Sequence, residues 1–90
     1  LETLGRGNVP PMMLDSIDKA IKLGIHIVIV SRCYSGRVLD TYAYVGGGKD
    51  LTNRGCILGG NFNGQKARIL LMLAISNGYS HKDIVKLYKL

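Results

Sequence analysis

Residues able to carry acid–base or nucleophilic chemistry are few in this chain, and they form no catalytic pattern. His26 stands inside an apolar run and His81 near the start of an expected helix. Neither has a serine, cysteine or carboxylate at a spacing that would build a catalytic triad. Of the acidic residues, only Asp40 and Asp50 fall in loops expected to line a cleft. The residues by themselves therefore predict no complete active site.

The motifs support neither a metal site nor a phosphate site. Cys33 and Cys56 are too far apart for a CxxC pair and too few for a metal site or a disulfide framework, which favours a reduced, cytoplasmic setting. The glycines at 46–48 precede a lysine, but a Walker A motif would need glycine at Ala43 and serine or threonine at Asp50. We interpret these glycines as structural turns, and we expect no metal and no cofactor.

The first elements needed to position such residues follow a strand–helix–strand order. Leu1 to Leu4 reads as the end of a strand. Pro10-Pro11 suits the start of a helix, whose apolar residues recur at 3.6-residue spacing until Gly24 ends it. Residues 25–30 form an almost unbroken β-branched run, typical of a parallel strand covered on both faces. This order predicts a βαβ unit.

The second half of the chain adds helices and one short strand. The expected elements are an extended excursion over 37–45, a short helix over 49–54, a strand over 56–58, a helix over 65–76 and a last helix from Ser80. The helix over 65–76 is apolar nearly all round, which predicts burial on most sides. Ser80 with Asp83 is a weak capping box, and Ile84, Leu87 and Tyr88 are expected to face inward. The whole order predicts an α/β fold, a small parallel sheet flanked by helices.

Length and composition limit the chain to one small domain or a piece of one. It has 90 residues, 47% hydrophobic and 20% charged, which is too apolar for disorder and suggests that some apolar surface packs against another chain or domain. Because the first residue is Leu1, we expect it to lie inside a longer gene product. No apolar run approaches the ~18–20 residues that span a bilayer, so no membrane partner is expected.

The net charge of +6 raises the question of nucleic-acid binding, but its distribution argues against it. The basic residues are dispersed, and Asp15–Lys19 and Asp18–Lys22 have the spacing of helical ion pairs. Aromatic residues that stack on bases are scarce. We therefore expect no nucleic-acid partner.

Three segments of the sequence indicate a protein family more specifically than composition, charge or hydrophobic pattern does. They are Gly5-Arg6-Gly7-Asn8-Val9-Pro10, the stretch from Ser31-Arg32 to Gly46-Gly47-Gly48, and Asn63-Gly64-Gln65-Lys66-Ala67-Arg68 followed by an apolar helix. In this order they resemble the C-terminal domain of bacterial L-asparaginases, in the asparaginase/glutaminase family. The resemblance covers essentially all of residues 1–90 and implies the Rossmann-like C-terminal domain of that fold.

The resemblance implies an amidohydrolase that converts L-asparagine and water to L-aspartate and ammonia. In the family, the threonine nucleophile, a second threonine and an Asp–Lys pair lie in the larger N-terminal domain, which is absent here. No T-G-G-T-I or T-D-T motif occurs in these residues. The expectation is therefore a chain with no catalytic residue of its own, inactive alone.

Residues that lie next to the substrate in the family are assigned to this chain only where its sequence matches the family's motif. Asn8 matches the first asparagine of the family's G-x-G-N-x-N loop, whereas Pro10 stands at the second. The family's glutamate after the second strand has no equivalent here, so Asp40 is expected to supply the charge, or Tyr42 and Tyr44 to line the neighbouring subunit's pocket. The choice between asparagine and glutamine stays open.

The family's assembly implies a homodimer or homotetramer of the full-length subunit, with the start of the helix over 65–76 at a subunit contact. We also expect the chain alone not to behave as a clean monomer. Two alternatives remain: the asparaginase-like subunit of a glutamine-dependent tRNA amidotransferase, and a small basic nucleic-acid-binding module. An effector site between subunits is also compatible with the sequence.

Overall fold

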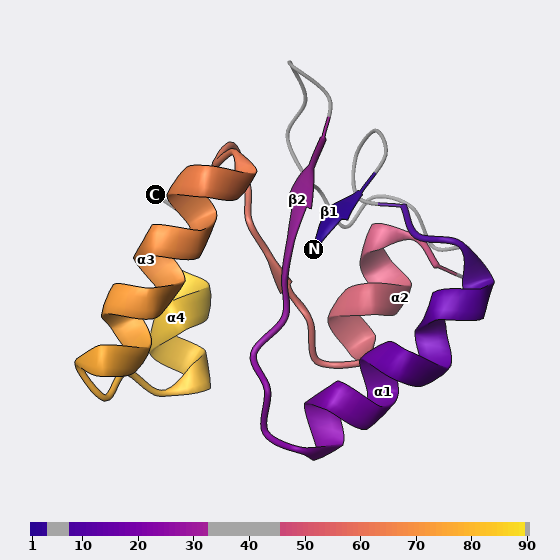
Figure 1. Ribbon diagram of the computed structural model, residues 1–90, viewed down its shortest axis with the longest axis horizontal. Coiled ribbons are helices and arrows are strands. Elements are labelled where there is room, and N and C mark those ends of the chain that lie inside the picture. Colours follow the sequence, from indigo (N-terminus) through magenta and orange to yellow (C-terminus); the bar gives the residue numbers. More distant parts are fainter. Residues whose placement is uncertain (4–7, 33–45, 90) are drawn as a thin grey trace.

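The structure is a computed structural model in which residues 1–3, 8–32 and 46–89 are described (Figure 1). The elements are, in order, β1 (Glu2–Thr3), the 3-10 helix η1 (Pro11–Met13), α1 (Leu14–Lys22), β2 (Val28–Ser31), α2 (Gly48–Asn53), β3 (Ile57–Leu58), α3 (Gly64–Ser76) and α4 (His81–Leu87). The excursion expected over 37–45 lies outside the described residues. Among the described residues, none of the helices is both long and apolar enough to cross a membrane.

The strands form one parallel sheet in the order β1-β2-β3. Glu2 lies opposite Val30, and Val28 lies opposite Ile57. The predicted α/β fold with a small parallel sheet is confirmed.

The central strand begins later than its composition predicts. The expectation of a strand over 25–30 is wrong for its first residues, because α1 ends in a Schellman motif that uses their backbone. Ile25 donates its amide to Ala20 O at 3.1 Å, and Gly24 donates to Ile21 O at 3.0 Å. The first contact with the sheet comes at Ile27, whose carbonyl accepts from Ile57 N.

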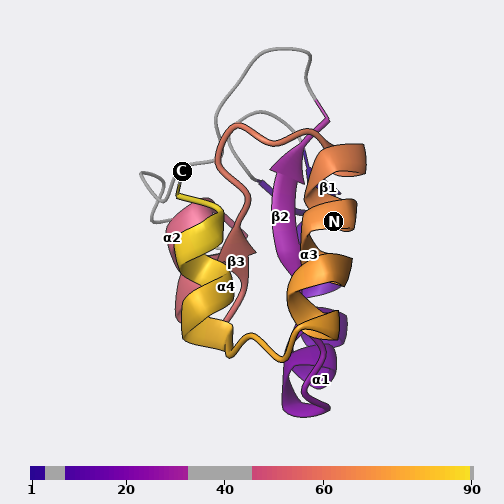
Figure 2. The same cartoon turned by 90° about the vertical axis from the view of Figure 1, so that its left-hand side faces the viewer.

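Two helices cover each face of the sheet (Figures 1 and 2). Ile29 of β2 is fully buried among residues of α1 and α2, including Leu14 and Leu51. Val28 and Val30 point the other way, into a cluster with α3 and α4. This alternation of two apolar faces is the reason why β2 reads as a nearly continuous apolar run.

Side-chain caps begin the last two helices. Asn63 Oδ1 accepts from Lys66 N at 2.8 Å at the start of α3, and Ser80 Oγ accepts from Asp83 N at 3.2 Å at the start of α4. The predicted start of the last helix at Ser80 is thus confirmed. Each cap satisfies a backbone amide that has no partner within its helix.

Helix α3 is apolar on two opposite sides, but this chain covers only one of them. The residues turned toward the sheet and α4 are Ala67, Leu70, Leu71 and Ala74. The other apolar side chains are exposed to 58% at Ile69, 54% at Met72, 58% at Leu73 and 51% at Ile75. The prediction that this helix is buried on most sides is therefore wrong for the chain by itself, because nothing in the described residues packs on its outer face.

Candidate functional site

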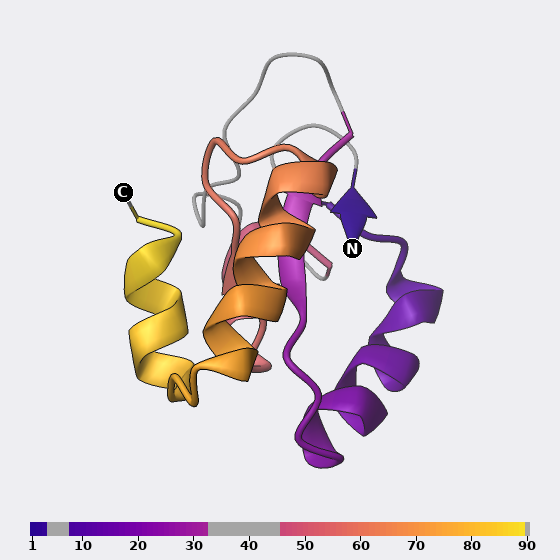
Figure 3. The ribbon, with the colours of Figure 1, turned by 60° about the vertical axis from the view of Figure 1, so that its left-hand side comes forward.

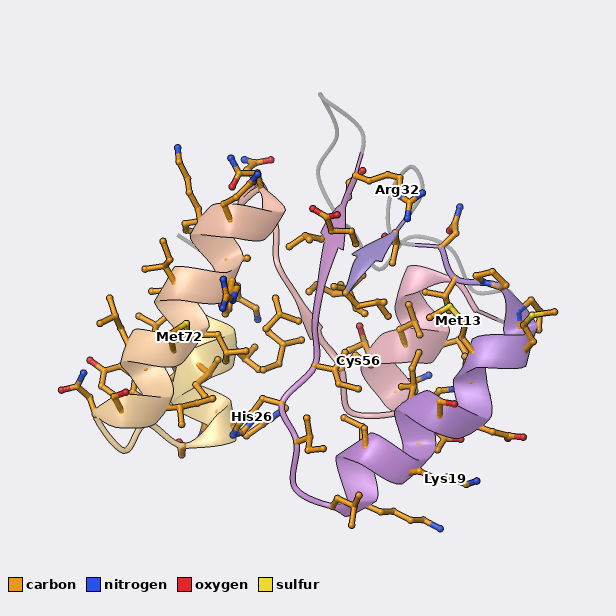
Figure 4. All side chains as sticks on the ribbon, in the orientation of Figure 1. Met13, Lys19, His26, Arg32, Cys56 and Met72 are labelled. Atoms are coloured by element: carbon orange, nitrogen blue, oxygen red, sulfur yellow. The ribbon has the colours of Figure 1, made fainter. Side chains whose placement is uncertain are left out.

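The carboxyl ends of the three parallel strands meet at one edge of the sheet. Asn8 follows β1, Arg32 follows β2 and the segment 59–63 follows β3. Arg32 is labelled at this edge in Figure 4. In open parallel sheets, ligands bind in the crevice outside this edge. The edge is therefore the candidate functional site.

At this edge, Asn8 carries a buried polar atom that has no hydrogen-bond partner among the described residues. Its side chain is half-buried, and its Oδ1 is shielded from solvent without a hydrogen-bond donor among the described residues. It is the only such buried side-chain atom in the described part of the chain. Buried oxygens of this kind are rare in folded proteins, and each calls for a donor that completes it. Asn8 Oδ1 is therefore a buried hydrogen-bond acceptor at this edge that no described donor satisfies.

The loop that carries Asn8 is held by the glycines at 46–48. Val9 N donates to Gly46 O at 2.9 Å, which ties the loop after β1 to the start of α2. Gly46 has φ +83°, and a Cβ there would collide with the carbonyl oxygen of Val9. Gly47 and Gly48 begin α2. These glycines form the turn and helix start expected of them.

A polar network anchors the same turn to α1. Gly46 N donates to Asp50 Oδ2 at 2.8 Å, Arg54 Nε donates to Asp50 Oδ1 at 3.0 Å, and Arg54 Nη1 donates to Asp18 Oδ2 at 2.6 Å. The Gly46 amide, with the Arg54 guanidinium, holds the pKa of Asp50 below its ordinary value. Asp50 is thus ionised at neutral pH and engaged with its own chain.

Two expectations about acidic residues are wrong. Asp50 was expected to line a cleft, but it lies in the first turn of α2, where it fixes the turn. Asp18 forms its ion pair with Arg54, not with Lys22. The i,i+4 spacing of Asp50 and Arg54 is the one signal in the sequence for this network.

The other predicted site residues are not placed by the structure. Asp40, Tyr42 and Tyr44 lie outside the described residues, as does Cys33. Their proximity to substrate stays a prediction. Arg32, the last described residue before them, follows β2 at the same edge as Asn8.

The side-chain hydroxyls of the described threonines donate hydrogen bonds to backbone carbonyl groups. Thr3 Oγ1 donates to Val30 O at 3.0 Å and is buried. Thr52 Oγ1 donates to Gly48 O at 2.9 Å. Neither has an imidazole, amine or carboxylate as its partner, so neither is arranged as an activated nucleophile.

Cys56 is the described thiol, and its environment makes it unreactive. It is buried against α1 and α2, near the centre of the view in Figure 4. Burial, together with the nearby Asp18 carboxylate, raises the pKa of Cys56 to about 11. Thiolate is the reactive form of cysteine. Cys56 therefore serves as part of the core.

We expect Cys56 to react with a thiol reagent at neutral pH at least about 100-fold more slowly in the native chain than in urea, because a pKa raised by about 2 units leaves that much less thiolate. The measurement is the absorbance change with an aromatic disulfide reagent, in a Cys33→Ser background so that a single thiol is followed. Equal rates with and without urea would show that Cys56 is open to solvent.

The two histidines lie at the opposite end of the sheet. His26 precedes β2 and stacks on His81 at the start of α4, with ring centroids 5.7 Å apart and planes 20° apart. No group of three or more histidine, cysteine or acidic side chains within the described ranges is arranged to hold a metal ion. The pair connects α4 to the segment before β2.

A large groove is separate from this edge. It has a volume of about 1020 Å³, and residues of β1, α1 and α3 are among those that line it. Figure 3 shows the ribbon of β1 between those of α3 and α1. Met12, Ile17, Val28 and Ile69 are among the apolar residues along it, and its described titratable residues are Glu2, His26 and Arg68.

Comparison with known proteins identifies the domain. The family described as Glutaminase/Asparaginase C-terminal domain matches residues 1–88. The chain belongs to this family. An L-asparaginase from Bacillus licheniformis is 40% identical to it over 86 residues, which cover 96% of this chain and 26% of that protein. A probable L-asparaginase from Deinococcus radiodurans is 35% identical over 88 residues, covering 98% of this chain and 26% of that protein.

The solved structures agree with this assignment. The crystal structure of L-asparaginase I from Vibrio cholerae superposes with a TM-score of 0.79 at 26% identity, over 100% of this chain and 27% of that one. The resemblance to the C-terminal domain of asparaginases, predicted from three segments of the sequence, is thus confirmed. The asparaginase C-terminal domain spans about a quarter of the length of these relatives.

Proposed function

We propose that residues 1–90 are the C-terminal domain of a cytoplasmic L-asparaginase, and that the full-length subunit hydrolyses L-asparagine to L-aspartate and ammonia. The observation that carries the proposal is the family match over residues 1–88, together with 40% identity to an L-asparaginase. In this proposal the catalytic threonines belong to an N-terminal domain outside this chain. The chain by itself is then inactive.

The chemistry of the described residues supports the proposal that the catalytic groups belong to the N-terminal domain, while this chain helps to position the substrate. The hydroxyls of Thr3 and Thr52 donate to backbone carbonyls, and the thiol of Cys56 is buried and protonated at neutral pH. At the carboxyl edge of the sheet, by contrast, Asn8 offers a carbonyl oxygen without a partner among the described residues. A hydrogen-bond acceptor of this kind suits the substrate's ammonium group, which it would position without taking part in bond chemistry.

We propose further that this edge faces the active site of a neighbouring subunit in a homodimer or homotetramer. Asn8, Asp40, Tyr42 and Tyr44 are the residues assigned to that position. The position of Asn8 after β1 and of Arg32 after β2, at the same edge of the sheet, supports the grouping. Substrate choice between asparagine and glutamine would then depend on how these residues meet the substrate's amino end.

The test compares ammonia release from L-asparagine by this chain and by the full-length product of the same gene. We expect activity from the full-length protein and none from the 90-residue chain, since the hydroxyls of Thr3 and Thr52 and the thiol of Cys56 are not arranged as activated nucleophiles. An active 90-residue chain would contradict the proposal. If both were inactive with L-asparagine, ammonia release from L-glutamine in the presence of a partner subunit and charged tRNA would favour the amidotransferase alternative.

The role of Asn8 is tested in the full-length protein by Asn8→Ala. Loss of one hydrogen bond to a charged group is worth about 1.5–3 kcal/mol, so kcat/KM should fall by about 10- to 100-fold. Asn53→Ala, at an exposed asparagine of α2, is the matched control and should leave kcat/KM unchanged. Equal kinetics for the two variants would assign Asn8 to the loop alone.

A further inference from the structure

The side chain of Arg54 ties α2 to α1. Its Nη1 donates to Asp18 Oδ2 of α1 at 2.6 Å, and its Nε donates to Asp50 Oδ1 of α2 at 3.0 Å. Because a guanidinium presents its N–H groups in one rigid plane, a single arginine holds two carboxylates in fixed relative positions. The two helices that Arg54 connects lie side by side in Figure 1.

The second oxygen of Asp50 extends this connection to the residue that follows Asn8. Asp50 Oδ2 accepts from Gly46 N at 2.8 Å, and Gly46 O accepts from Val9 N at 2.9 Å. Val9 is the next residue after Asn8 in the chain. A continuous row of four hydrogen bonds therefore runs from Asp18 to the backbone beside Asn8.

Val9 passes the position of the Gly46 turn on to Asn8. The side chain of Val9 is buried in one core cluster with Leu14 and Leu51. Pro10, the residue after it, favours an extended backbone at Val9. With its side chain and its backbone both held, Val9 has little freedom to turn, so a shift of Gly46 is transmitted to the neighbouring Asn8.

We propose that Arg54 and Asp50 are positioning residues for Asn8, because they hold the Gly46 turn and thereby fix how Asn8 Oδ1 meets the ammonium group of L-asparagine. Neither side chain touches the substrate in this arrangement. The inference rests on the function proposed above, in which Asn8 lies at the substrate's amino end.

The exposure of the network favours positioning over a general contribution to stability. The side chains of Arg54 and Asp18 are 27% and 41% exposed, and ion pairs this open to solvent usually stabilise a fold little. Asp50, however, accepts from the amide of a glycine with φ +83°, so its carboxylate constrains an unusual turn. Hydrogen bonds to charged groups are the stronger and more directional ones. The network therefore acts mainly on local geometry.

The test uses Arg54→Met in the full-length protein, with Lys19→Met as the matched control. Each substitution removes one positive charge, and Lys19 is an exposed residue of α1 beside Asp18. Because Asn8 would hold the ammonium group in the bound substrate and in the transition state alike, KM should rise while kcat stays nearly unchanged. We expect KM for L-asparagine to rise about 10-fold in Arg54→Met and not in Lys19→Met. Equal KM values for the two variants would overturn the proposal.

A double-mutant cycle with Asn8→Ala shows whether Arg54 acts through Asn8. Effects of residues that act through one another are not additive. The rise in KM caused by Arg54→Met should therefore be absent once Asn8 is replaced by alanine. The same rise in both backgrounds would contradict the proposal, since Arg54 would then act on the substrate by another route.

Succinamic acid, which is L-asparagine without its α-amino group, provides a second kinetic readout. It has no ammonium group for Asn8 to hold, so its inhibition constant against L-asparagine hydrolysis should be the same in wild type and Arg54→Met. Equal weakening of succinamic acid and L-asparagine by Arg54→Met would indicate a general disturbance of the site and overturn the positioning role.

Amide hydrogen exchange at Val9 tests the network without relying on activity. In the full-length protein, this amide should exchange about 10-fold faster in Arg54→Met than in Lys19→Met, because its bond to Gly46 O opens more often. Unchanged exchange would overturn the proposal even in a protein inactive with L-asparagine. Faster exchange with unchanged kinetics of Asn8→Ala would confirm that Arg54 holds this loop and overturn the role of Asn8 at the substrate, so the two proposals fail separately.

Discussion

Gly46→Ala is expected to destabilise the chain by about 3 kcal/mol, from about 1–2 kcal/mol of left-handed backbone strain and a steric overlap of similar size. Gly46 has φ +83°, and its Cβ would collide with the carbonyl oxygen of Val9. Relief of that collision requires Val9 and Gly46 to move apart, which breaks the 2.9 Å hydrogen bond from Val9 N to Gly46 O. The measurement is the free energy of unfolding in urea, followed by circular dichroism.

Gly24→Ala is the matched control for this substitution. Gly24 has nearly the same backbone conformation, with φ +81°, but no atom lies within 4 Å of its Cβ position. Only the cost of the left-handed conformation, about 1–2 kcal/mol, is expected there. The difference between the two variants isolates the contact with Val9. Equal losses would mean that Gly46 does not hold the loop of Asn8 in place.

The local elements could be predicted from the sequence because their signals are local. Pro10-Pro11 and Gly24 bound η1 and α1, and Ser80 caps α4 as its type and position indicate. The alternating faces of β2 follow from its β-branched run. The error at the start of β2 arose because a Schellman motif depends on the backbone of Gly24 and Ile25 rather than on their hydrophobicity.

The candidate site could be predicted less well from the sequence, because its contacts join residues that are far apart along the chain. The ion pair of Arg54 with Asp18 spans 36 positions, and no local pattern indicates it. Asn8 was assigned through resemblance to a family; its unpartnered Oδ1 depends on packing that the sequence does not express. The apolar helix over 65–76 shows the same limit. Its composition predicts burial on most sides, whereas the described residues cover only the side that faces the sheet and α4.

Tyr88→Ala is expected to cost about 4 kcal/mol, a large share of the roughly 5–13 kcal/mol that stabilises a chain of this length. Tyr88 is the largest fully buried side chain and is 1% exposed. Its ring packs edge-on against Phe62 at 5.6 Å, and its hydroxyl donates to Ala67 O at 2.6 Å. These contacts join the end of α4 to α3, so their loss should also loosen α3. Urea unfolding measures the first effect and amide hydrogen exchange over α3 the second.

Tyr88→Phe separates the ring from the hydroxyl. It keeps the packing and removes one hydrogen bond, so about 1 kcal/mol is expected. Burial raises the pKa of Tyr88, which means that the folded chain keeps the phenol neutral where the unfolded chain ionises it. Its contribution is therefore full below pH 10 and is lost as the pH rises through the raised pKa. The stability difference between wild type and Tyr88→Phe should shrink over that range, and a difference independent of pH would show that the hydroxyl is solvated rather than held by Ala67.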